Sequence, residues 1–254
     1  SAMIWLLGVV PIVLSLGLWY VLTLGAAEER VLSPVILPSP SEVLGSFPSL
    51  WFERALSRSL FTSFLRVLVG FAVGALVAVP LGIGMASFES VRAAFRPLTT
   101  GFGYLPIPTL VPLTLSLFGT GELQKVMFLA LAFFVYLVPL VVKAIDDVDS
   151  VYLQTAFTLG ASTRQAVGRV LVAIAWPDIF QALRNGFGVG WGYILLAEMV
   201  AAETGLGNII ITSQRRGPRE HIYLVLVVIT LVAFLTDRAW GWAGRRLFPY
   251  REAK

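Results

Sequence analysis

The sequence predicts an all-α membrane protein with about six transmembrane helices in a single domain. Of its 254 residues, 57% are hydrophobic and only 13% are charged, and the mean hydropathy is +0.82. Soluble domains carry about 25% charged residues. Long apolar runs recur along the chain, and no hydrophilic segment between them is long enough to bury a core of its own. We therefore expect one membrane domain over residues 1–254.

Six runs approach the roughly 20 apolar residues that a transmembrane helix needs. The third run is interrupted by prolines, the fourth is short, and the fifth contains Glu198. The expected spans are residues 3–24, 67–88, 97–121, 126–142, 185–202 and 221–236.

The distribution of basic residues predicts the orientation of these spans. An even number of spans places both termini on one side, together with the polar segment 146–184. That side carries more Lys and Arg than the other, so the positive-inside rule places the termini and segment 146–184 in the cytoplasm. On the other side, residues 32–40 are too rich in proline to form a helix. Ser41 is expected to cap a short helix that begins at Glu42.

The polar segment 146–184 predicts two short helices joined at a glycine. Asp149 or Ser150 can cap a first helix that runs through Leu159. Gly160 follows at the position where a left-handed residue commonly ends a helix, and glycine adopts that conformation without a steric penalty.

The second helix of the segment has its own start signal. Ser162 and Gln165 have the spacing of a capping box, in which each side chain accepts from the other residue's main-chain N–H. This helix is expected to run to about Trp176, where Pro177 closes or restarts it. A segment of this shape suits a groove on a partner, although a hairpin that only covers the bundle is an equal alternative on spacing alone.

Composition excludes several classes of protein. The chain has no cysteine, so it has no disulfide, thiolate zinc site or cysteine nucleophile. Its single histidine, His221, cannot build a multi-histidine metal site, and we interpret it as an interfacial residue. We predict no catalytic residue and no metal site. The net charge of +4 is attributed to loops that face cytoplasm and anionic lipid, since no basic run suggests nucleic-acid binding.

Two ionisable residues fall at or near membrane depth. A charge there costs at least about 2.5 kcal/mol, so it should face protein or water. Glu198 either lies beside a solute route or forms a structural ion pair or helix-end contact, and we favour the structural alternative. Arg66, at the start of the second span, is interpreted as able to extend outward to the interface.

Irregular backbone marks two further places in the spans. The third span contains a proline-rich stretch, and kinked backbone at membrane depth is tolerated only where protein or a cavity covers it. We interpret residues 104–112 as a path or gate segment, with a packing kink as an equal alternative; the candidates are Tyr104, Pro106, Pro108 and Pro112. Gly186, Gly188, Gly190 and Gly192 are interpreted mainly as sites of close helix packing.

Residues 154–173 resemble the EAA loop of ABC importer permeases. Gln154-Thr155-Ala156 stands at the Glu-Ala-Ala position and Gly160 at the glycine, while Val172-Ala173 replaces the usual Leu-Pro. Other motifs are similar, in the same order, to nitrate, sulfonate and taurine permeases, and together they cover about residues 32–248. They lie at 37–43, 59–71, 80–84, 106–108, 112–113, 118–122, Lys125, 188–191, 197–199 and 204–207.

The resemblance implies a type I ABC importer permease fold with segment 146–184 as a cytoplasmic coupling loop. It implies a subunit without its own ATPase, because the chain has no Gly-x(4)-Gly-Lys-Ser/Thr loop; ATP and Mg²⁺ would be bound by partners, and no cofactor by this chain. The implied coupling residues are Gln154, Ala156, Gly160, Ala161, Ser162 and Arg164, and Trp191 and Glu198 join the candidate path residues.

The implied assembly contains two ABC ATPases, a second permease subunit and a periplasmic or lipid-anchored binding protein, in the lipid of a bacterial cytoplasmic membrane. The second permease is expected to be an identical copy, with a different subunit as the alternative. The expected solute is a small anion such as nitrate, a sulfonate, taurine or bicarbonate. Alternatives are an aromatic or vitamin-precursor solute, an ATPase-independent secondary transporter, or a membrane-embedded enzyme.

Overall fold

The computed structural model describes residues 2–251, and the surroundings of side chains over residues 8–250. Expectations that involve Ser1 or residues 252–254 lie outside the described residues.

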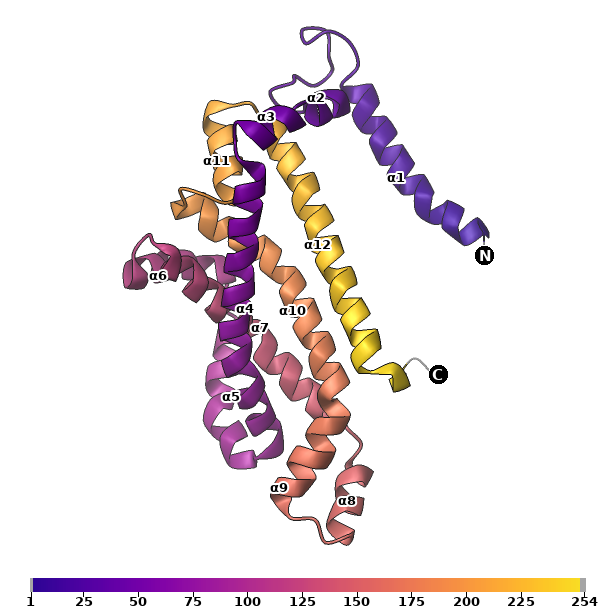
Figure 1. Ribbon diagram of the computed structural model, residues 1–254, viewed down its shortest axis with the longest axis vertical. Coiled ribbons are helices and arrows are strands. Elements are labelled where there is room, and N and C mark those ends of the chain that lie inside the picture. Colours follow the sequence, from indigo (N-terminus) through magenta and orange to yellow (C-terminus); the bar gives the residue numbers. More distant parts are fainter. Residues whose placement is uncertain (1, 252–254) are drawn as a thin grey trace.

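The described residues form helices joined by turns, without a β-strand (Figure 1). The α-helices are α1 (Ala2–Leu22), α2 (Pro40–Gly45), α3 (Phe47–Phe52), α4 (Leu56–Ser87), α5 (Glu89–Gly103), α6 (Leu110–Phe118), α7 (Glu122–Asp146), α8 (Ser150–Thr158), α9 (Thr163–Gln165), α10 (Val172–Ala201), α11 (Leu206–Arg216) and α12 (Glu220–Leu247). Shorter elements are η1 (Ile107–Thr109), the π-helix η2 (Ala166–Leu171) and η3 (Pro249–Arg251).

The core lies between α4, α7 and α10, which run side by side (Figure 1). Aromatic side chains fill it, and Phe71 packs edge-to-face against Phe133 and Phe187 with ring centroids 5.2 and 5.3 Å apart. The helices approach closely where α4 carries glycine. A Cβ added at Gly74 would lie 2.8 Å from the carbonyl oxygen of Ala130 in α7, closer than side-chain contacts allow. Small residues thus bring the helix backbones together, as is common in membrane bundles.

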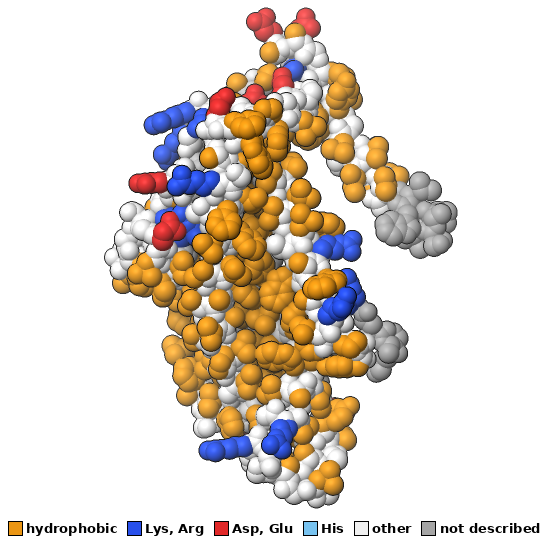
Figure 2. Space-filling view, in the orientation of Figure 1, with side chains coloured by type: hydrophobic (Ala, Val, Ile, Leu, Met, Phe, Trp, Pro, Cys, Tyr) orange, Lys and Arg blue, Asp and Glu red, His pale blue; other side chains and the backbone are white. Residues whose placement is uncertain are grey.

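Four described helices are long and apolar enough to cross a membrane, and a fifth crossing is possible if one bent pair counts as a span. The four are residues 56–87, 122–146, 163–201 and 220–247, and the bent pair is 89–103 with 107–118. Residues 8–22 form a shorter apolar helix. The all-α membrane fold is confirmed, and the count of six spans stays a prediction. Figure 2 shows hydrophobic side chains over the middle of one face, with charged side chains gathered mainly toward its ends.

Several expected boundaries are wrong. The second span begins at Leu56 instead of residue 67, because residues 56–66, which precede the apolar run, belong to the same helix. The third is not one continuous helix: its two halves meet at 93°. The break falls at residues 104–106, where Pro106, and Pro108 just beyond it, lack the N–H that a continuous helix needs.

Pro177 does not end the helix that follows residue 162. It is buried inside α10, which continues to Ala201 without interruption. A single proline removes one hydrogen bond, and packing against neighbouring helices can stabilise the remaining turns. The fifth span therefore begins well before residue 185.

The expected cap at Ser41 is also wrong, because Ser39 caps α2. The hydroxyl of Ser39 accepts from the N–H of Glu42, while the carboxylate of Glu42 accepts from the N–H of Ser39.

Candidate functional site

The first half of segment 146–184 is a short helix with a side-chain cap. Asp149 is the N-cap of α8, and its Oδ1 accepts from the main-chain N–H of Val151 at 2.9 Å. The helix ends at Thr158, with Leu159 as its C-cap. Of the two predicted caps, Asp149 is confirmed, and the predicted end at Leu159 agrees within one residue.

A left-handed glycine turns the chain after α8. Gly160 has φ = +83°, a conformation that other residues adopt only with strain. The N–H of Ala161 donates to the carbonyl oxygen of Ala156 at 3.0 Å, and this bond closes the helix end. The expected role of Gly160 at the turn is confirmed.

The second helix starts as the sequence predicts. Ser162 and Gln165 form the capping box, with Gln165 Oε1 accepting from the N–H of Ser162 at 2.9 Å. The helix then passes through the wider turns of η2 before it joins α10. We call residues 149–171 the α8–α9 hairpin, and Figure 1 shows it at the opposite end of α10 from α11.

The hairpin is anchored on one side and open on the other. Ala156, Ala166 and Leu171 are buried, and Leu171 packs in a cluster with Val141 and Ile145 of α7. Among the predicted coupling residues, Ala156 therefore faces inward, Ala161 is half-buried, and Gln154, Gly160, Ser162 and Arg164 are exposed.

Sequence reasoning missed the exposed apolar side chains of the hairpin. Leu159 is 82% exposed at the turn, and Phe157 is 49% exposed beside it. Val151 and Tyr152 are also exposed in α8. The sequence did offer a sign of them, because these large hydrophobic residues stand among polar residues in segment 146–184. An anchored hairpin with apolar groups at its tip has the form of a docking element.

The candidate path residues fall in two separate environments. Tyr104 is 84% exposed at the bend between α5 and α6, where Pro106, Pro108 and Pro112 are exposed as well. Trp191 and Glu198 are buried inside the bundle. The structure thus does not bring the two sets together as one site within a single chain, and their role in a path stays a prediction.

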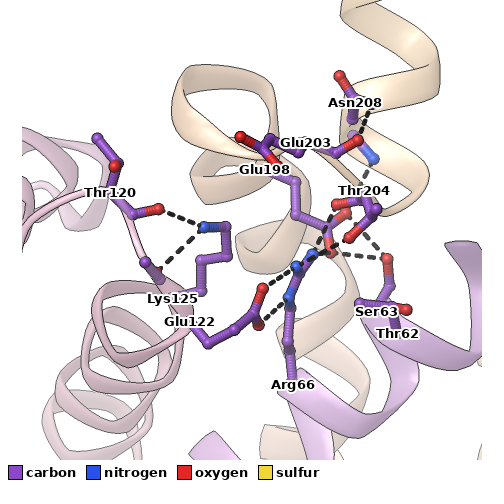
Figure 3. Close-up of polar contacts among 12 residues, drawn as sticks. Thr62, Ser63, Arg66, Thr120, Glu122, Lys125, Glu198, Glu203, Thr204 and Asn208 are labelled. Atoms are coloured by element: carbon purple, nitrogen blue, oxygen red, sulfur yellow. Dashed lines mark hydrogen bonds and ion pairs between the residues drawn. The ribbon is translucent and has the colours of Figure 1, made fainter.

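Glu198 is the acceptor in a buried polar cluster formed by three helices and a loop (Figure 3). Arg66 Nη1 of α4 donates to Glu198 Oε1 at 2.7 Å, and the Ser63 hydroxyl donates to the same oxygen at 2.7 Å. The N–H of Gly207 donates to Glu198 Oε2 at 2.9 Å. The carboxylate therefore accepts hydrogen bonds from α4 and from the start of α11. This agrees with the structural ion pair and helix-end contact that we favoured.

Arg66 joins Glu198 to a second carboxylate. Its Nε donates to Glu122 Oε2 at 2.7 Å, and its Nη2 donates to the other oxygen, so the pair is bidentate. Its Nη1 also donates to the carbonyl oxygen of Thr204 at 2.8 Å. The expectation that Arg66 extends to the interface is wrong, because two carboxylates hold a side chain that is only 4% exposed. We call Ser63, Arg66, Glu122, Lys125, Glu198 and Thr204 the Arg66 cluster.

Lys125, the other cation of this cluster, forms no ion pair with any of the described residues. Its Nζ donates to the carbonyl oxygens of Thr120 at 2.9 Å and Gly121 at 3.1 Å, and the residue is 2% exposed. Figure 3 shows its ammonium between the start of α7 and the loop that precedes α11. Sequence reasoning noted Glu122 and Lys125 only as motif positions, because their partners are distant in the sequence.

Two other expectations are resolved by packing. His221 is buried instead of interfacial, and its Nε2 lies 2.7 Å from the Ser49 hydroxyl of α3.

Gly190 packs so closely on Phe133 that an added Cβ would lie 2.4 Å from its ring. Gly186 packs similarly, whereas Gly188 and Gly192 have open space beside them. The packing interpretation therefore applies to two of these four glycines.

Comparison with known proteins gives one family. Residues 78–248 match the family described as "Binding-protein-dependent transport system inner membrane component". A probable ABC transporter permease protein of Brucella abortus is 30% identical over 246 residues, which cover 97% of this chain and 96% of the relative. The taurine transport system permease protein TauC of Escherichia coli is 30% identical over 239 residues, which cover 91% of this chain and 84% of the relative.

Solved structures show the same fold. An inward-facing structure of the MetNI methionine ABC transporter aligns with a TM-score of 0.69 and 20% identity, covering 79% of this chain and 98% of that one. An amino acid ABC transporter crystallised with histidines aligns with a TM-score of 0.64 and 18% identity, covering 78% of this chain and 97% of that one.

Proposed function

The chain belongs to the family of binding-protein-dependent transport system inner membrane components and so is an ABC importer permease. From this premise we propose that it forms the transmembrane path for a small anion, and that partner ATPases drive the import. The observation that carries the proposal is the α8–α9 hairpin. It is capped at both helices, anchored to α7, and exposes apolar side chains around Leu159.

The exposed tip supports docking into a groove of a cytoplasmic ATPase. An exposed leucine beside an exposed phenylalanine offers apolar surface that association would bury. In this proposal Gln154, Gly160, Ser162 and Arg164 surround the tip and contact the ATPase, while Ala156 and Ala161 hold the turn. Closure of two ATPases around ATP and Mg²⁺ moves two hairpins, and α10 carries each displacement into the bundle.

The remaining partners and the location follow from the same proposal. Two permease subunits, identical in the simplest case, form the path in a bacterial inner membrane, with termini and hairpins in the cytoplasm. A periplasmic or lipid-anchored binding protein delivers the solute to the opposite face. Kinked backbone at residues 104–112, which is exposed in a single chain, suits a path shared between the two subunits.

The solute is proposed to be a small anion of the sulfonate or nitrate class. The relatives support this: TauC of Escherichia coli is named for taurine, SsuC of Bacillus subtilis for aliphatic sulfonates, and NrtB of Synechocystis for nitrate.

Reconstitution tests the proposal. The chain would be placed in proteoliposomes with its ATPase and binding protein, and ATP hydrolysis would be measured against taurine, alkylsulfonates, nitrate and bicarbonate. We expect stimulation that requires both the binding protein and one of these solutes. Failure of the chain to associate with an ATPase would overturn the proposal.

A variant of the turn tests the coupling role within the same assay. Proline cannot adopt the positive φ of Gly160, so Gly160→Pro distorts the hairpin while leaving the spans intact. We expect ATP hydrolysis to continue without solute uptake, or the ATPase to dissociate. The control is Gly45→Ala, which changes a glycine of α2 that has no atom within 4 Å of an added Cβ. This variant is expected to transport normally. Normal transport by Gly160→Pro would contradict the assignment.

A further inference from the structure

A polar cavity lies beside the Arg66 cluster, at the other end of α10 from the hairpin. Its volume is about 690 Å³, within the range of small-molecule sites. One wall is the start of α7 with Thr120 and Lys125. The other wall is the end of α10, the following loop and α11, which contribute Glu203, Asn208 and Arg215.

The wall formed by the start of α7 carries a buried cation with spare hydrogen-bonding capacity. The ammonium of Lys125 has three N–H donors, and two of them donate to carbonyl oxygens of the preceding loop. The carboxylate of Glu122, at the start of the same helix, is occupied by its bidentate contact with Arg66. A buried ammonium without an ion pair and with a third donor beside a cavity favours an anionic group.

The rim of the cavity carries charges of both signs. Arg215 and Arg216 lie at the end of α11, are exposed, and form no ion pair within the described residues. Glu203 lines the cavity near the end of α10 and is likewise exposed and without an ion pair there. The unpaired groups are therefore three cations and one carboxylate, an arrangement that suits a solute with a strong anionic head and a cationic end.

We infer that this cavity is a binding site for a small zwitterion with a strongly anionic head, with an aminosulfonate as the probe class. The anionic head lies on Lys125 and the arginines of the rim, and the ammonium faces Glu203. Nitrate and a plain alkylsulfonate carry no positive charge and would therefore meet Glu203 without an opposite charge. The inference rests on the proposed function and narrows its solute class.

Two probes separate the roles of the charges. Taurine and ethanesulfonate have the same two-carbon sulfonate and differ by the ammonium group alone. Binding of each would be measured by isothermal titration with the full chain and its ATPase in lipid nanodiscs, without nucleotide or binding protein. We expect taurine to bind at least tenfold more tightly than ethanesulfonate, as one charged hydrogen bond allows.

Variants of exposed residues test the site without disturbing the core. Glu203→Gln is expected to remove the preference for taurine, with about a tenfold loss of taurine affinity and none for ethanesulfonate. Arg215→Gln with Arg216→Gln is expected to weaken both probes about tenfold or more. The control, Arg245→Gln with Arg246→Gln, changes net charge equally at the far end of α12 and is expected to change neither affinity.

The outcomes distinguish this inference from the proposed function. If the ATPase copurifies and hydrolysis is coupled, yet neither probe binds the permease, the inference is wrong and the proposed function stands. An unchanged taurine preference in Glu203→Gln also overturns it, as does equal weakening by the rim and control pairs. If no ATPase associates, the proposed function fails, whereas taurine-selective binding that depends on Glu203 would still support the site.

Discussion

The α8–α9 hairpin and the Arg66 cluster lie near opposite ends of α10 and are built in opposite ways. The hairpin is stabilised by contacts between residues a few positions apart, such as Ser162 with Gln165, and it exposes apolar side chains. The cluster joins residues as distant as Arg66 and Glu198, 132 positions apart, and buries charge. The first is suited to meet a partner, whereas the second fixes three helices relative to one another.

This difference predicts where substitutions affect stability and where they affect association. Removal of the buried carboxylate of Glu198 leaves buried donors of Arg66, Ser63 and Gly207 without their acceptor and breaks one of the two ion pairs of Arg66, which is strongly unfavourable. An exposed apolar residue at the hairpin tip contributes little to the folded chain alone. We therefore expect large stability effects at the cluster, intermediate effects in the core between the two regions, and small global effects at the hairpin and in the loops.

Glu198→Ala is expected to have the largest effect. It removes the acceptor for Arg66, Ser63 and the N–H of Gly207, and breaking a buried pair costs about 3–5 kcal/mol. Thermal unfolding in nanodiscs would measure the loss. Glu203→Ala, an exposed carboxylate five residues along the chain, is the control and should change stability by less than about 0.5 kcal/mol. Equal stability of the two variants would contradict a structural role for the cluster.

The glycines of α10 offer a matched pair in the core. Gly190→Ala places a Cβ 2.4 Å from the Phe133 ring and is expected to destabilise the bundle by about 1–3 kcal/mol. Gly188→Ala meets nothing within 4 Å and should be neutral or slightly stabilising, since alanine is the better helix former. Chemical unfolding of the two variants would measure the difference, and a larger loss at Gly188 would refute the packing described here.

Gly160→Ala is expected to act locally. Its φ of +83° costs an alanine about 1–2 kcal/mol, so the hairpin should open more often while the bundle stays intact. Hydrogen exchange would show faster exchange of the N–H of Ala161, which closes the end of α8. Amides near Glu198 should keep their protection. A matching increase in exchange at both places would mean that the hairpin and the cluster unfold together.

The Arg30–Glu42 pair gives the smallest expected effect, and it depends on pH. Hydrogen bonds from Arg30 and from the N–H of Ser39 lower the pKa of Glu42 from 4.5 to about 2. An acid with a lowered folded-state pKa contributes stability that is complete above about pH 4.5 and is lost as pH falls toward 2. Unfolding measured between pH 6 and pH 3 should show a smaller pH dependence for Glu42→Gln than for the wild type.

The hairpin was predictable because its signals are local. A capping aspartate, a left-handed glycine and a capping box each determine structure within four residues of their own position. The cap at Asp149 and the turn at Gly160 follow from the sequence alone. The fate of Pro177 does not, since one proline either ends or merely bends a helix, and the packing around it decides.

The Arg66 cluster was only partly predictable. The cost of burying charge predicts that Glu198 has a partner, but sequence spacing does not identify Arg66 or Ser63 as that partner. The burial of His221 against Ser49 was missed for the same reason, because the two residues are 172 positions apart. The exposure of Leu159 was missed differently: its apolar character was visible, but only the fold shows that nothing within the described chain covers it.

The central claim is that the hairpin tip contacts a cytoplasmic ATPase, and site-specific crosslinking tests it most directly. The chain has no cysteine, so Leu159→Cys introduces a unique thiol at the tip. Val31→Cys is the control, a similarly exposed apolar position (77% against 82%) in the loop at the other end of the molecule. With a short thiol-reactive photocrosslinker, we predict an ATPase adduct from residue 159 that changes in yield with ATP, and none from residue 31. The absence of an adduct at 159 from an assembled, ATP-hydrolysing complex would contradict the account.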